Sequence, residues 1–283
     1  IVVSISSTAD KAGLFATAGN GAVIKNLTVA GSVSGKTGVG GFVGELTSGQ
    51  DGITVENCVN KAAVTGSGAR VGGFIGNGHT CTSKANVKLT NLTNFGNITC
   101  TLTSGHGALG GIAGMAWAQF NNCQNYGKLT ASDQTAGGIV GWTYGSDVAN
   151  CANFGTIEGT SVIYGGIMGL NGGVSSIQNC LNAGSIETTN SNNYSLGGLL
   201  GEAATTNTIS NSLSIKTGSA KVQALAGLVK DSTNISSNVS ITNSYYLSGL
   251  LSAAGIAKTE EELKNSSILS LLGENWNFTE NYD

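Results

Sequence analysis

The sequence predicts an all-β fold, a parallel β-helix or solenoid of about eight coils of about 30 residues each, with a short C-terminal capping helix. Three observations predict it. Two different short elements recur along the chain with a shared period. The segments between them alternate Val, Ile, Thr and aromatic residues with small polar ones, as in half-buried strands. The composition also suits continuous sheet, so we expect a rod of stacked coils that share one core.

The first repeated element is a doubled glycine followed by apolar residues and a third glycine. Counted from the second glycine, successive copies are 27 to 38 residues apart. The full copies are Gly40–Gly44, Gly72–Gly76, Gly110–Gly114, Gly137–Gly141, Gly165–Gly169 and Gly197–Gly201, with degenerate copies at 12–15 and 226–229. Glycine inside a strand pattern marks a bend or a close approach of two backbones. We expect one of these at each doubled glycine.

The second element opens with an asparagine, and its copies are 28 to 34 residues apart. This residue is Asn26, Asn57, Asn91, Asn122, Asn150, Asn179, Asn211 or Asn243. Two markers with a common period near 30 are typical of a solenoid or a propeller, and a propeller blade takes about 40 residues or more. The shorter period therefore favours one coil of a solenoid.

Positions counted from this asparagine predict which side chains face inward. Positions +1, +3, +5 and +7 share one face of a strand, and the apolar residue at +7 makes that face the inner one. Small cysteines recur at +1 and asparagines at +3, and each amide can bond its equivalents one coil above and below. The predicted structural ladder consists of Asn60, Asn94, Asn125, Asn153, Asn182, Cys58, Cys123, Cys151 and Cys180.

These elements resemble the GLUG-motif repeats of bacterial cell-surface proteins. The resemblance covers about residues 10–248, and it is carried by the Gly-Gly elements at 40–44, 137–141 and 197–201, by the Asn-Cys-x-Asn-x-Gly-x-Ile elements at 150–157 and 179–186, and by residues 24–33. It implies an extracellular location on the bacterial cell surface, within large adhesin-like chains or beside protease domains. It supplies no catalytic residues.

The composition limits the classes of partner that we expect for this chain. The chain has 283 residues with 44 glycines, no proline, 10% charged residues and a net charge of −3. The absence of proline fits ladders that need every backbone N–H. The charges form no basic stripe, so we expect no nucleic-acid partner. No run of 18 apolar residues occurs, so we expect no transmembrane segment in what we interpret as a mature or trimmed fragment.

The C-terminal region departs from the repeat. Thr259 to Glu262 form a capping box, and the apolar residues that follow predict a helix over about 260–272. We expect its apolar face to cover the open end of the solenoid, which would otherwise present unpaired strand edges. The expected domains are a GLUG-type solenoid over residues 1–250 and a helical cap and tail over residues 251–283.

Outward-facing aromatic residues are the candidate ligand-binding residues. Position +4 holds an aromatic residue in three successive coils, so these rings should stack on the outside, and further aromatic residues follow the Gly-Gly element in two neighbouring coils. The two sets are Phe95, Tyr126 and Phe154, and Trp117, Trp142 and Tyr144. Such rings can form a platform for sugar rings or for a partner side chain. Alternatively, they shield the sheet and pack on each other.

Each coil is counted from one second glycine of the Gly-Gly element to the next, so the first begins at residue 13 and the enlarged third coil spans residues 73–111. The third coil holds two cysteines outside the ladder and both histidines of the chain. Three alternatives are open for them: unlinked surface residues in a long loop, a Cys81–Cys100 disulfide, and a zinc site built from His79, Cys81, Cys100 and His106. The spacing of the zinc set matches no strong rule. We therefore expect no metal and no cofactor. The ladder cysteines are interpreted as small buried core residues.

We expect no enzyme. Glu158 and Glu187 should be outward neighbours in adjacent coils, and a close carboxylate pair could act as acid and base on a polysaccharide. Two solvated acids are the simpler interpretation, and no basic residues cluster near them in the sequence. A threonine array for ice binding is not expected either, because Thr99, Thr101 and Thr103 alternate in one coil only.

The predicted function is that of a non-enzymatic repeat domain, secreted or on the cell surface, that acts in adhesion or displays a binding face on a rigid solenoid. Its expected partners are a glycan or a host extracellular protein, together with the other domains of a larger surface protein. Two alternatives stay open, a carbohydrate-active β-helix that binds or cleaves polysaccharide and a passive stalk or spacer.

Overall fold

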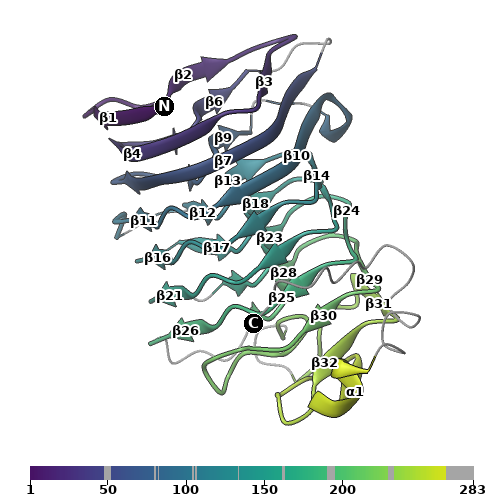
Figure 1. The fold of residues 1–283 in the computed structure, drawn as a ribbon. Coiled ribbons are helices and arrows are strands. Elements are labelled where there is room, and N and C mark those ends of the chain that lie inside the picture. The colour runs from purple at the N-terminus through teal and green to yellow at the C-terminus, as the bar shows by residue number, and fades with distance from the viewer. Residues whose placement is uncertain are drawn as a thin grey trace.

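The computed structural model describes residues 1–47, 52–79, 81, 83–103, 105, 107–132, 134–160, 163–189, 195–228 and 233–265. Within them the chain winds into a parallel β-solenoid of about seven turns of about 31 residues, so the predicted fold class is confirmed (Figure 1). The degenerate last copy of the Gly-Gly element forms isolated bridges rather than a strand, from Gln223 to Gly197 and from Ala226 to Leu200.

Two of the three sheets follow the Gly-Gly element. Strands that end at its first glycine form a six-stranded sheet of β5 (Val39–Gly40), β8 (Val71–Gly72), β12 (Ala108–Gly110), β17 (Thr135–Gly137), β22 (Tyr164–Gly165) and β27 (Leu196–Gly197). Strands that begin two residues after its second glycine form a seven-stranded sheet of β2 (Phe15–Ala18), β6 (Val43–Leu46), β9 (Ile75–Gly78), β13 (Ala113–Ala116), β18 (Val140–Thr143), β23 (Met168–Asn171) and β28 (Leu200–Ala203).

The third sheet has 20 strands and covers the rest of each coil in three ranks. The first rank precedes the repeated asparagine and holds β3 (Val23–Lys25), β14 (Gln119–Asn121), β19 (Asp147–Ala149), β24 (Ser175–Gln178), β29 (Asn207–Ser210) and β31 (Val239–Thr242). The second rank follows it and holds β15 (Gln124–Asn125), β20 (Ala152–Asn153), β25 (Leu181–Asn182), β30 (Leu213–Ser214), β32 (Tyr245–Leu247) and β33 (Ile256–Lys258). The third rank holds β1 (Val2–Ser6), β11 (Ile98–Cys100), β16 (Leu129–Ala131), β21 (Ile157–Gly159) and β26 (Ile186–Thr188). Three longer strands span more than one rank, namely β4 (Thr28–Gly35), β7 (Ile53–Gly66) and β10 (Val87–Asn94).

The repeated asparagine is the bend between the first and second ranks. All eight copies have φ between 44° and 57°, a left-handed backbone conformation that asparagine adopts more readily than most residues. The side chains of five copies form an outer ladder, in which Asn150 donates to the adjacent Asn121 in place of Asn122. The Nδ2 atom of Asn91 donates to Oδ1 of Asn57 at 2.9 Å, and Asn122 donates to Asn91 at 2.7 Å. This residue therefore serves both the turn and the stacking of the coils.

The asparagines at position +3 form a second ladder inside the solenoid, as predicted. Asn60, Asn94, Asn125, Asn153 and Asn182 are fully buried. Each of the first four donates from Nδ2 to Oδ1 of the next, at 2.7 to 3.0 Å. Each also donates to the backbone carbonyl two residues further on. Buried amides need such partners, and here every coil supplies them to its neighbours.

The doubled glycines are close approaches of the backbone, one of the two predicted alternatives. A Cβ atom on Gly138 would lie 2.0 Å from the carbonyl oxygen of Gly166 and 2.4 Å from Cγ of Asn153. A Cβ atom on the second glycine of the element at 41, 73, 111 or 166 would likewise clash with the inner asparagine of the same coil. Glycine is needed there for space. This contact is the reason why the two repeated elements occur together in every full coil.

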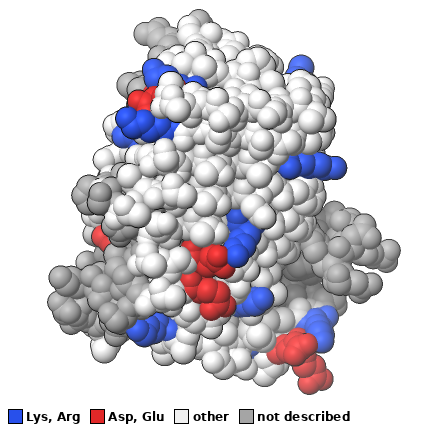
Figure 2. Space-filling model, turned by 90° about the vertical axis from the view of Figure 1, so that its left-hand side faces the viewer, with Lys and Arg blue, Asp and Glu red and all other residues white. Residues whose placement is uncertain are grey.

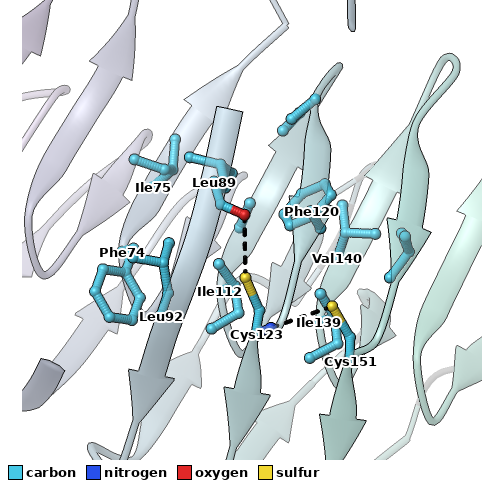
Figure 3. Close-up of a cluster of buried hydrophobic side chains, with 14 of the residues drawn as sticks. Phe74, Ile75, Leu89, Leu92, Ile112, Phe120, Cys123, Ile139, Val140 and Cys151 are labelled. Atoms are coloured by element: carbon cyan, nitrogen blue, oxygen red, sulfur yellow. Dashed lines mark hydrogen bonds between the residues drawn. The ribbon is translucent and has the colours of Figure 1, made fainter. Parts of the chain in front are cut away.

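The core consists of two apolar clusters on either side of this contact. The larger one contains Phe42 and Phe74, whose rings stack with centroids 4.7 Å apart, together with the ladder cysteines. Figure 3 shows part of it between the sheets. The smaller cluster contains the apolar residues at position +7, among them Ile98 and Leu129. The glycines and asparagines therefore form a narrow polar layer between the two apolar clusters.

The C-terminal helix begins where the sequence predicts. Helix α1 (Glu260–Lys264) has Thr259 as its N-cap, with both hydrogen bonds of a capping box. The predicted extension to 272 lies outside the described residues. Leu263 packs against Leu213 and Tyr245, which occupy the outward position +2, so the helix lies on the side of the last coils. β33 pairs with the last strand of the repeat, β32. Since more than half of the predicted helix lies outside the described residues, its covering of the open end stays a prediction.

Candidate functional site

The predicted ring stack at position +4 is present. The centroids of Phe95 and Tyr126 are 5.0 Å apart with 16° between their planes, and those of Tyr126 and Phe154 are 4.7 Å apart with 11°. The β10–β15 and β15–β20 pairings set this register. Both faces of the Tyr126 ring are covered by its neighbours, so the stack presents mainly ring edges. It is exposed, with 49% of Phe95 accessible.

A second aromatic group lies along the seven-stranded sheet. Pairing of β13 with β9 and β18 places Trp117 and Tyr144 in one column with His79. The Trp117 and Tyr144 rings are 5.8 Å apart at 79°, and His79 lies 5.2 Å from Tyr144. Trp142 stacks on Tyr144 at 5.5 Å. The structure therefore brings together the three predicted residues and adds His79, which the sequence suggested only as a metal ligand.

A shallow cavity of about 270 Å³ opens beside this group. We call it the aromatic groove, and it is lined by Ser83, Lys84, Trp117, Tyr144, Gly145 and Val174. The short 3-10 helix η1 (Lys84–Asn86), capped by Ser83, brings Lys84 to its rim. Lys84 forms an ion pair of 2.7 Å with Asp147, whose Oδ1 atom also accepts from Ser176 at 2.8 Å.

The charge state of the groove depends on few groups. Partial burial lowers the pKa of His79, and the positive charge of Arg70 lowers it further. His79 is therefore neutral at pH 7. The Lys84–Asp147 pair brings one charge of each sign. The groove thus combines aromatic surface with a paired donor and acceptor and has no net charge.

Within the described residues, the third coil contains neither the suggested Cys81–Cys100 disulfide nor the suggested zinc site. Cys81 and Cys100 are not joined by a disulfide, and both are fully buried, so the alternative of surface residues is wrong for these two cysteines, whereas His79 is exposed. The Cys100 thiol donates to the carbonyl of Gly68 at 3.2 Å. His106 lies outside the described residues. Among those described, no group of three or more His, Cys, Asp or Glu side chains could hold a metal ion.

The ladder cysteines are core residues, as predicted. Cys58, Cys123, Cys151 and Cys180 are free and at most 1% exposed. Figure 3 shows the Cys123 thiol donating to the carbonyl of Leu89 at 3.3 Å, and the Cys123 amide donating to Sγ of Cys151. Burial raises the pKa of the Cys151 thiol well above its usual value, and the neighbouring Cys123 and Cys180 raise it further. Thiolate, the nucleophilic form, is therefore suppressed.

The native protein is accordingly expected to show no thiol reactivity. An aromatic disulfide reagent at pH 8 should label none of the six cysteines before denaturant is added and all of them afterwards, because each thiol is buried. Absorbance of the released thiolate measures the count. A Thr65→Cys variant, with its new thiol on an exposed position, should give one equivalent. Rapid native labelling of Cys81 or Cys100 would contradict their burial.

The two candidate carboxylates are neighbours but not part of the groove. Glu158 and Glu187 pair directly across β21 and β26. Glu158 forms an ion pair of 2.7 Å with one basic residue, Lys128. Ser219 donates to Glu187 at 3.3 Å. Figure 2 shows such small groups of opposite charge on a largely uncharged face. Neither glutamate lines the aromatic groove.

Hydroxyl side chains line up across coils in a way that the sequence analysis missed. Thr65, Thr99 and Thr130 are paired in register on the third rank, and Ser34 precedes them on β4. The expectation of alternating threonines in one coil concerned positions along a single strand, and it did not foresee this column across coils. The column ends where Glu158 takes the next position. Comparing the same position in successive coils would have found it.

No helix among the described residues is both long and apolar enough to cross a membrane. A family model described as the GLUG motif matches residues 132–158, which contain the Gly-Gly element of β17 and β18, the repeated Asn150, and Trp142 and Tyr144. No curated protein and no solved structure gives a match. The chain is therefore a β-solenoid repeat protein that carries a GLUG motif.

Proposed function

We propose that this chain is a non-enzymatic, extracellular repeat domain of a bacterial surface protein that binds glycans through aromatic side chains held on a rigid solenoid. The observation that carries the proposal is the gathering of outward aromatic rings over the third to fifth coils, in the aromatic groove and in the ring stack. Groups of exposed aromatic residues are typical of interaction sites, and aromatic rings with polar neighbours suit ligands that are apolar on one face and hydrophilic at the rim.

The rigid scaffold supports this function. Trp142 lies on a strand and the other five rings come directly after the end of one. The register of these strands is held by backbone pairing and by the inner ladder. A preformed site loses little conformational freedom on binding, which leaves more of the interaction energy as affinity. The surface location is supported by the resemblance to GLUG-motif repeats, as is the attachment to other domains of a larger protein.

The proposal is tested by binding of the purified chain to glycan and extracellular-matrix protein arrays. Saturable glycan binding is expected, and Tyr144→Ala should weaken it roughly tenfold, equivalent to about 1.4 kcal/mol. Phe95→Ala tests the ring stack in the same way. Phe15→Ala is the matched control, since Phe15 is 42% exposed on the first coil, and it should bind as the parent does.

The other outcomes each favour a different function. Binding to matrix proteins alone would replace the glycan by a host protein as the partner. Glycan cleavage during the assay would support the carbohydrate-active alternative. An absence of binding to every glycan and protein, with circular dichroism showing an intact fold, would favour a spacer and refute the proposal.

A further inference from the structure

We infer that the aromatic groove takes the terminal ring of a neutral glycan, that is, one uncharged pyranose with neighbouring hydroxyl groups. This inference rests on the proposed function and adds the ligand class and the mode of binding. It is carried by the size of the groove, by the angle between its two rings and by the paired charges at its rim.

The size of the groove suits a single sugar ring. Its volume of about 270 Å³ lies below the ~300–1,000 Å³ that drug-sized ligands occupy. Gly145 and the exposed Val174 border it on the side of the fifth and sixth coils, and Ser83 and Lys84 border it on the side of the third. A long polysaccharide lying along the solenoid would find no continuous trough here.

The two ring planes define a corner rather than a platform. Trp117 and Tyr144 meet at 79° with centroids 5.8 Å apart. One ring face can pack on the C–H face of a pyranose, while the second ring closes the side. An extended chain needs parallel rings along its length, as in the Phe95–Tyr126–Phe154 stack, where the faces already cover each other. The corner therefore favours a chain end.

The paired charges match a diol rather than an acid. Lys84 offers further N–H donors beside the one that Asp147 takes. Both bonds to the Asp147 carboxylate end on Oδ1, and no other described residue reaches its Oδ2 atom. A donor and an acceptor at neighbouring positions complement two adjacent hydroxyls, each of which donates and accepts. A sugar carboxylate would be attracted by Lys84 but repelled by Asp147.

The test uses the full chain and nuclear magnetic resonance titrations with simple probes. The probes are the methyl pyranosides of glucose, galactose and mannose, methyl glucuronide, and di- and tetrasaccharides that end in each of these three neutral rings. At least one neutral methyl pyranoside should bind, the uronide should bind at least tenfold more weakly, and affinity should rise less than about threefold from one ring to four.

Variants assign the binding to the groove. Trp117→Ala should abolish detectable binding of the neutral ring, and Lys84→Gln, a conservative change at a half-exposed side chain, should weaken it at least threefold without affecting the fold. Phe15→Ala should leave it unchanged. Lys84→Gln keeps the test decisive if Trp117→Ala does not fold.

The contrary results separate this inference from the function on which it rests. Equal or tighter binding of the uronide would overturn the neutral ligand. Binding of the tetrasaccharide but of no single ring would overturn the terminal mode, and unchanged affinity in Lys84→Gln would remove the groove as the site. Each of these leaves glycan binding intact, whereas no binding to any saccharide would refute both.

Discussion

A Gly138→Ala variant is expected to lose about 3–5 kcal/mol of the free energy of unfolding, which is near the upper limit for adding one methyl group to a packed interior. The new Cβ would lie 2.0 Å from the carbonyl oxygen of Gly166 and 2.4 Å from Cγ of Asn153. The first atom belongs to the backbone of the next coil and the second to the inner ladder. Neither can move without disturbing other coils, so the clash cannot relax locally.

The measurement is the midpoint and slope of urea denaturation followed by circular dichroism. Gly19→Ala is the matched control. Its Cβ would lie 3.2 Å from the side-chain oxygen of Thr47 and 3.7 Å from its carbonyl oxygen, an ordinary contact distance, so its stability should change by less than about 1 kcal/mol. A Gly138 variant as stable as this control would show that the doubled glycine is not required for space.

An Asn125→Ala variant is expected to lose at least roughly 2–6 kcal/mol, because the two neighbouring ladder amides each lose a partner at about 1–3 kcal/mol. The buried carbonyl of Gly127 loses its bond from Nδ2 of Asn125 as well. Asn125 accepts from Nδ2 of Asn94 at 2.7 Å and donates to Oδ1 of Asn153 at 2.9 Å. Both neighbours are fully buried, so water cannot replace the lost bonds. Urea denaturation again measures the loss.

Two further variants identify the ladder as the cause. Asn121→Ala, which removes only an exposed hydrogen bond from Asn150, should change stability by at most about 0.5 kcal/mol. The double variant Asn125→Ala, Asn153→Ala should lose less stability than the sum of the two single losses. Asn125→Ala already leaves Oδ1 of Asn153 without its donor, so removing Asn153 costs less in that background. Strict additivity would show that each asparagine acts alone.

The inner ladder and the ring stack were predictable because they lie in the part of the coil that has constant length. Between the repeated asparagine and position +8 no coil contains an insertion, so equal spacing in the sequence becomes register in the sheet. Asn125 and Tyr126 could therefore be placed from period two alone. The left-handed bend at the repeated asparagine could also have been predicted from the sequence, because few other residues adopt this backbone conformation as readily.

The groove could not be predicted in the same way. His79 and Lys84 belong to the enlarged third coil, where the step between glycines is 38 residues, and the path of an inserted segment is not fixed by the repeat. Their contacts with Tyr144 and Asp147 join residues that are 65 and 63 positions apart. Trp117 and Tyr144 were found as aromatic residues, but the angle between them depends on side-chain packing.

The two asparagine columns also have an electrical consequence. In the inner column every amide nitrogen points to the coil that follows, from Asn60 towards Asn182. In the outer column the nitrogens point to the coil that precedes, as from Asn179 to Asn150. The amide dipoles of one column therefore oppose those of the other, whereas the aligned peptide dipoles of a helix add up to partial charges at its ends. Coils could be added to such a rod without polarising its two tips.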